Sequence, residues 1–151
     1  PFKPSKTLEN LLTSRKAVIN FIDDVRVFAG IVTKEKKDWD IELSNPSYPY
    51  LVDTNTYISV KVIDIEENDV RPNITCEEIN TEIIRPFLGF NRAQSAVIEG
   101  AVLTSRLGMI EDDKIKKEIK YLKIAIDKTA GSRELEAWKW ILLKIDNYFK
   151  K

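Results

Sequence analysis

The sequence has no histidine and only one cysteine among its 151 residues. The absence of histidine excludes the Ser-His-Asp and Cys-His arrangements of nucleophilic catalysis and the commonest zinc and iron sites. A single thiol, Cys76, excludes an intramolecular disulfide, cysteine-rich zinc sites and CxxC redox chemistry. We expect Cys76 to pack within a strand, because Ile74 and Thr75 precede it. If the protein is an enzyme, a borrowed cofactor has to supply the difficult chemistry.

An excess of charge of either sign is also absent, because 24 Lys and Arg balance 24 Asp and Glu. A nucleic-acid or anionic-membrane binder normally carries a basic excess, so neither partner is expected. No apolar run reaches the roughly 18 residues of a transmembrane helix. One cysteine and no recognisable signal peptide predict a cytoplasmic protein. The chain opens with Pro1 and Phe2, as if in mid-strand, which predicts a fragment or a processed product.

The first part of the chain predicts strands mixed with short helices. The expected elements are a helix starting at Ser5 or Thr7, a buried strand over 17–22, an amphipathic helix over 25–32, a loop over 44–49, and antiparallel strands over 56–63 and 70–84. The polar stretch 77–80 suggests a bulge or a sheet edge in the last strand.

From residue 87 the apolar period changes from two to 3.6, which predicts helices. One helix runs over 92–107 with Asn91 as its N-cap, a second follows Glu111, and a third is capped by Ser132 with Leu135 and Trp138 on its buried seam. We therefore predict an α+β fold, with a domain over 1–86 and a helical portion over 87–151. The sequence has no GxGxxG or GxxxxGK[ST] loop, so Rossmann and P-loop sites are unsupported.

The start of the first helix is a candidate phosphate site. Ser5 and Thr7 offer hydroxyl groups, Lys6 offers a positive charge, and the helix offers free backbone N–H groups; Asn10 lies one turn further along. The same residues also fit an ordinary helix cap with a solvated lysine.

Asn91 and Arg92 form a second candidate site at the start of a later helix. The following face carries small side chains, namely Ala93, Ala96, Val97, Gly100 and Ala101. One interpretation is tight helix packing with surface ion pairs. In the other, Asn91 and Arg92 point at a bound anion and the small-residue face packs on a partner subunit.

Two of the tryptophans are not expected to be fully buried in the core. Trp140 lies off the third helix's seam, which favours an interface, and Trp39 is expected to be partly buried. No residue stands out as a catalytic acid or base, so the catalytic residues are unknown, and no set of metal ligands is present.

Two segments resemble known protein families. The segment Pro1–Leu11 resembles the turn that enters the short helix of flavin-reductase-like split-barrel proteins, where such a turn holds the phosphate of FMN. The segment Phe90–Gly100, continued by Thr104–Leu107, resembles an uncharacterised, mainly archaeal family called domain of unknown function 447. Members of that family join an FMN-binding split barrel to a C-terminal helical segment, and the order of elements agrees along the whole chain.

The resemblance implies an FMN-binding split β-barrel, partly truncated at the N-terminus, followed by a three-helix C-terminal segment. It implies that Ser5, Lys6 and Thr7 hold the phosphate, with Asn10 in the helix behind them; Asn91 and Arg92 join them as candidate cofactor-binding residues. It also implies a homodimer, because split barrels usually build the flavin site between two subunits.

Our leading hypothesis is an FMN-binding protein. If the protein is an enzyme, we expect a reductase that uses a nicotinamide or deazaflavin donor. The alternative is a non-catalytic dimeric interaction module with no cofactor. The small-residue face and Trp140 favour that alternative.

Overall fold

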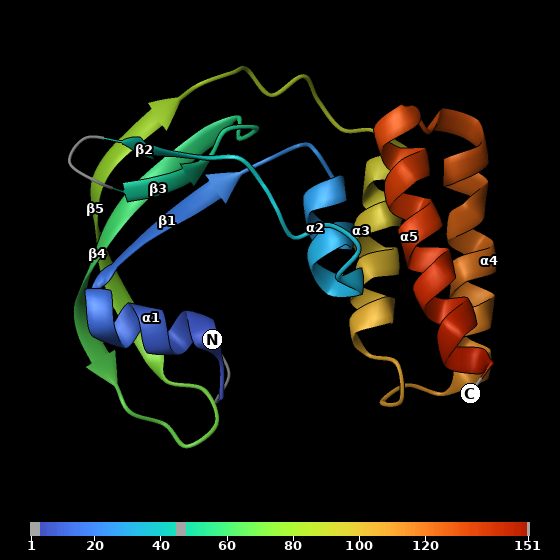
Figure 1. Cartoon of the computed structure of the whole chain (residues 1–151), viewed down its shortest axis with the longest axis horizontal. Coiled ribbons are helices and arrows are strands. Elements are labelled where there is room, and N and C mark those ends of the chain that lie inside the picture. Colours follow the sequence, from blue (N-terminus) through green and yellow to red (C-terminus); the bar gives the residue numbers. More distant parts are fainter. Residues whose placement is uncertain (1–3, 45–47, 151) are drawn as a thin grey trace. The chain divides into compact units, whose positions relative to one another are not determined.

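The structure of the protein, a computed structural model, describes residues 4–44 and 48–150. Pro1–Lys3 of the N-terminal motif and residues 45–47 of the expected loop lie outside the described residues. The elements are α1 (Lys6–Ser14), β1 (Lys16–Phe21), α2 (Arg26–Thr33), β2 (Ile41–Ser44), β3 (Tyr48–Leu51), β4 (Thr56–Glu66), β5 (Asn73–Ile83), α3 (Arg92–Ser105), α4 (Asp112–Thr129) and α5 (Ser132–Phe149). The described fold is therefore a mixed α+β arrangement of helices and small antiparallel sheets (Figure 1).

The chain divides into two compact units. Unit 1 comprises residues 1–22 and 40–87, and unit 2 comprises residues 23–39 and 88–151. Helix α2 thus belongs with the later helices, although it lies in the first part of the sequence. The division into two domains at residue 86 stays a prediction.

The main sheet of unit 1 has the strand order β1-β4-β5, and all its pairs are antiparallel. The register between β4 and β5 shifts after Ser59 and again after Val62. The first shift leaves Ile79 of β5 without a register partner, since Ser59 lies opposite Asn80 and Val60 lies opposite Glu78. Because β5 is also an edge strand, the expected bulge or edge around residues 77–80 is confirmed.

Three expectations for unit 1 are wrong. The strand over 17–22 exists as β1, but it is an edge strand on which Ile19 is 48% and Phe21 is 50% exposed. Of the described part of the expected loop over 44–49, Ser44 ends β2 and Tyr48 and Pro49 begin β3, and these two strands pair in an antiparallel ladder that tolerates Pro49. Cys76 is exposed on β5 instead of packed, because its strand lies at the sheet edge.

The β2–β3 hairpin packs on the three-stranded sheet through Tyr50. Its ring stacks on that of Tyr57 in β4, with 4.4 Å between centroids and 18° between planes. The Tyr57 hydroxyl donates to Glu82 of β5, and the Tyr50 hydroxyl donates to Glu42 at 2.7 Å. These hydrogen bonds raise the pKa of Tyr57 and raise the pKa of Tyr50 to about 12. Each phenol therefore remains protonated and keeps donating to its carboxylate up to strongly alkaline pH.

The core of unit 2 forms where α3 contacts α2, α4 and α5 (Figure 1). All five small residues of the α3 face are buried in this core. A Cβ added at Gly100 would lie 2.9 Å from Cζ3 of Trp138, which is itself 4% exposed. The interpretation that this face packs tightly within the chain is confirmed. The interpretation that a partner subunit packs on this face is wrong, because α5 already occupies it.

The N-caps of α3 and α5, both in unit 2, differ in how well the sequence predicted them. Asn91 caps α3 as expected. The expected cap of α5, Ser132, is instead its first helical residue; Gly131 is the N-cap, and its N–H donates to the Glu134 carboxylate at 2.8 Å. Leu135, expected on the buried seam, is 53% exposed.

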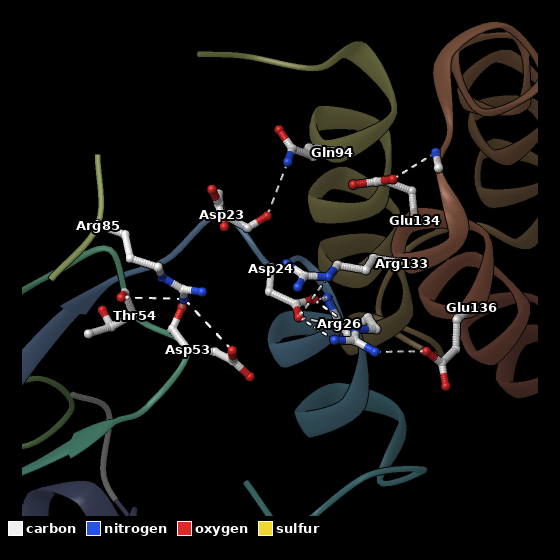
Figure 2. A network of polar contacts seen from close by, with 11 residues as sticks. Asp23, Asp24, Arg26, Asp53, Thr54, Arg85, Gln94, Arg133, Glu134 and Glu136 are labelled. Carbon is white, nitrogen blue, oxygen red and sulfur yellow. Dashed lines mark hydrogen bonds and ion pairs between the residues drawn. The ribbon is translucent and has the colours of Figure 1, made fainter. Parts of the chain in front are cut away.

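A buried carboxylate joins α2 to α5 (Figure 2). Asp24 is 1% exposed and accepts from the Arg26 backbone N–H at 3.0 Å and from its guanidinium at 2.6 Å. Arg133 lies 3.8 Å from the same carboxylate, and Arg26 also pairs with Glu136 at 3.1 Å. Burial raises the pKa of Asp24, but the hydrogen bonds from Arg26 and both arginine charges outweigh it and hold the pKa below its usual range.

Candidate functional site

The start of α1 offers hydrogen-bond donors that the helix itself leaves unused. Ser5 is the N-cap, and its hydroxyl oxygen accepts from the Leu8 backbone N–H at 3.2 Å. The N–H groups of the first helical residues, Lys6 and Thr7, have no acceptor one turn earlier in the helix. An anion placed there would meet two backbone donors and the positive end of the helix dipole.

Lys6 and Thr7 are exposed at this helix end. Lys6 pairs with Glu9 at 3.1 Å, and the two side chains are 81% and 63% exposed. Such exposed pairs contribute about 0–1 kcal/mol, so the ammonium can exchange Glu9 for a phosphate at little cost. The observed geometry is thus compatible both with a capped, solvated helix and with a phosphate anchor.

Asn10 lies apart from Ser5, Lys6 and Thr7. It lines a groove of about 410 Å³ in unit 1, together with the last turn of α1, the start of β1 and Tyr48 of β3. The Thr13 hydroxyl donates to the Glu9 carbonyl at 2.9 Å, and the Ser14 hydroxyl donates to the Asn10 carbonyl at 2.8 Å. These bonds fix the helix end that forms one wall of the groove.

Asn91 and Arg92 lie in unit 2, and they differ in whether their side chains are already engaged within the fold. The Asn91 side-chain oxygen accepts from the Ala93 N–H at 2.8 Å, and its amide donates to the Thr129 carbonyl at 3.0 Å. Both ends of Asn91 are therefore engaged by the backbone of unit 2. Arg92 is exposed beside a groove of about 240 Å³ between α3 and α4, which Glu99 also lines.

The sequence did not single out the other residues of the unit 1 groove. Lys16 directly precedes the expected strand over 17–22, and Tyr48 falls in the expected loop over 44–49. The alternation Tyr48-Pro49-Tyr50 was the available signal, since it has the period of a strand. Among the described residues, no cluster of three or more acidic or cysteine side chains could hold a metal ion.

Comparison with known families agrees with the predicted resemblance. The model of the "Protein of unknown function (DUF447) N-terminal domain" matches residues 1–85, and that of "Protein of unknown function (DUF447)" matches residues 91–142. The chain belongs to the DUF447 family. The suspected membership is therefore confirmed.

A solved DUF447 structure has a similar fold. It is the crystal structure of an FMN-bound protein from Methanosarcina mazei, with a TM-score of 0.78 and 21% sequence identity. The match covers 95% of this chain and 78% of the other. No curated protein matches the chain. Within residues 4–44 and 48–150, every helix is too short or too polar to cross a bilayer.

Proposed function

We propose that this DUF447 chain binds FMN, and that its strands form part of a split barrel. The observation that carries the proposal is the likeness of fold, over 95% of the chain, to a family member crystallised with FMN. The resemblance of Pro1–Leu11 to the phosphate turn of split-barrel flavoproteins supports the same cofactor.

The start of α1 fits the phosphate end of FMN. Lys6 supplies a charge that is held only by an exposed pair with Glu9, and Thr7 supplies an exposed hydroxyl. The backbone N–H groups of both residues complete a cradle for a dianion, and charge-assisted hydrogen bonds of this kind are the strong ones. In this proposal Ser5 keeps its capping bond to Leu8 and orients the cradle, and Asn10 is a candidate cofactor contact from the helix behind it.

When bound, FMN would supply the electron and hydride transfer that no side chain of this protein offers. The task of the chain is then to anchor the phosphate and exclude water from the ring. A reductase with a nicotinamide or deazaflavin donor, a homodimer that completes the flavin site and a cytoplasmic location belong to the same proposal. Their support is the family resemblance, together with the single cysteine for the location.

The second group of candidates contributes less to this proposal. Arg92 is exposed and is retained as a candidate for contact with the cofactor. Asn91 already caps α3, and its part in FMN binding stays a prediction. The non-catalytic interaction module has lost one of its motivating features, because the small-residue face is buried within unit 2.

A flavin titration tests the anchor. Lys6→Ala combined with Thr7→Ala should raise the Kd for FMN roughly 100-fold, since two hydrogen bonds to a charged phosphate are lost. Quenching of flavin fluorescence reports the Kd. The matched control, Lys37→Ala with Thr75→Ala, also removes one exposed ammonium and one exposed hydroxyl and should bind FMN as the unmodified protein does. An unmodified chain that leaves flavin fluorescence unchanged contradicts the proposal.

A further inference from the structure

The groove of unit 1 carries a cation without a neighbouring acid. The Lys16 ammonium lies 5.3 Å from the centroid of the Tyr48 ring, which forms a buried wall. No carboxylate in the described part of the chain pairs with Lys16, and no acidic residue lines the groove. A ligand in this groove therefore meets a positive charge that the protein leaves uncompensated.

The sheet register places a second lysine beside Lys16. Lys16 of β1 lies directly opposite Lys61 of β4, so the two side chains share one face of the sheet. Like charges directly opposite one another are destabilising. Glu77 of β5 lies opposite Lys61 on its other side and can offset that lysine, whereas β1 is an edge strand and brings Lys16 no acid. An anion beside Lys16 would relieve the repulsion.

The free edge of β1 presents backbone groups to the same groove. The Val62 N–H donates to the Arg15 carbonyl at 2.9 Å, which sets the alternation of bonds to β4. Lys16 and Val18 accordingly direct their backbone groups away from β4. Those of Lys16 are taken by the Ser14 hydroxyl, at 3.3 and 3.1 Å. Within residues 4–44 and 48–150, Val18 thus has one N–H donor and one carbonyl acceptor left for a ligand, and Asn10 lines the same groove.

We propose that this groove is a second ligand site, which takes a phosphate monoester whose ring carries an amide. The phosphate binds at Lys16, and the amide pairs with the backbone edge at Val18, two residues further along the strand. The groove adjoins the C-terminal half of α1, whereas the proposed FMN anchor is at its N-terminus. Nine helical residues span about 13 Å, which separates the first and last backbone groups of α1. The site goes beyond FMN binding and does not depend on it.

Nicotinamide mononucleotide is the probe that combines both groups, and nicotinamide riboside is the same molecule without its phosphate. Each is titrated into the full 151-residue chain while amide ¹H–¹⁵N shifts are followed. We expect saturable shift changes at Thr13, Ser14, Lys16 and Val18, with the mononucleotide binding roughly tenfold more tightly than the riboside. Changes that fail to saturate, or that lie elsewhere, overturn the proposal.

Lys16→Gln separates the phosphate contact from a general charge effect. It should weaken mononucleotide binding roughly tenfold and leave riboside binding unchanged. Lys37→Gln removes the same charge from an exposed position of unit 2 and should change neither affinity. Equal behaviour of the two variants overturns the assignment of Lys16. Displacement of the mononucleotide by one equivalent of FMN overturns the claim of a second site, while a chain that ignores FMN but binds the mononucleotide supports this site alone.

Discussion

Asp24 makes more charged hydrogen bonds and ion pairs than any other buried side chain that we describe in unit 2. Its carboxylate is 1% exposed, yet it accepts three side-chain hydrogen bonds and one backbone hydrogen bond from Arg26 and lies near Arg133. A buried ion pair of this kind need not stabilise a fold more than apolar residues of the same size would. Removing Asp24 is different, because it leaves the partly buried Arg26 guanidinium with only the exposed Glu136 to offset its charge.

Asp24→Asn should therefore lower the free energy of unfolding by about 2–4 kcal/mol at neutral pH. The folded pKa of Asp24 lies below its unfolded value of about 3.9, so its contribution is complete above that pH and is lost as the pH falls through the folded pKa. Urea unfolding across this acid range should be less pH-dependent in the variant. Asp127→Asn, which removes an exposed pair with Lys123, should cost less than about 1 kcal/mol. Equal costs for the two variants would contradict the role of Asp24.

Helix ends are the features that connect local sequence to the candidate sites. Asn91 begins α3 with a complete capping box, in which the Gln94 side chain accepts from the Asn91 N–H at 3.2 Å. The same asparagine donates to Thr129, the last residue of α4. One side chain thus caps one helix and ties it to the end of another.

Asn91→Ala should lower the free energy of unfolding by about 1–2 kcal/mol, because it removes the cap and the bond to Thr129. If Asn91 acts only as a cap, the Kd for FMN stays unchanged. Asn91→Ser keeps a hydroxyl acceptor for the Ala93 N–H and loses only the bond to Thr129, so it should cost less than the alanine variant. Thermal unfolding and flavin quenching, measured on the same samples, separate the two roles. Unaltered stability with weaker FMN binding would assign Asn91 to the cofactor instead.

On the scale of the whole molecule, ligand binding should act on one compact unit. The proposed anchor and the unit 1 groove both lie within residues 1–22 and 40–87. A ligand that binds only the folded state stabilises it by about 2.7 kcal/mol at a concentration of 100 Kd. That gain applies to the unit whose unfolding destroys the site.

Hydrogen exchange with and without FMN locates this effect. We expect slower exchange in α1, β1 and β4 when FMN is present, and a smaller change in α4 and α5, because the anchor residues belong to unit 1. Protection confined to α3 and α4 would instead favour Arg92 as the principal anchor and contradict the assignment to Ser5, Lys6 and Thr7.

The sequence by itself determined the features that depend on neighbours along the chain. The cap of α3 at Asn91 follows from its cap residue, and the structure contains it. The sequence also offered Ser5 or Thr7 as the cap of α1 and a bulge or an edge in β5; the structure has Ser5 as the cap, and β5 is both bulged and at the edge. Family membership was also readable, since it rests on local motifs.

Only the tertiary structure decided which surfaces are covered. The small side chains of α3 are compatible with any closely approaching helix, and the folded chain places Trp138 of α5 there. The hairpin of β2 and β3 depends on pairing and on the stack of Tyr50 over Tyr57, neither of which leaves a strong pattern in four-residue strands. The groove at Lys16 exists because α1, β1 and β3 converge, and convergence of distant segments is a property of packing, which local periodicity does not encode.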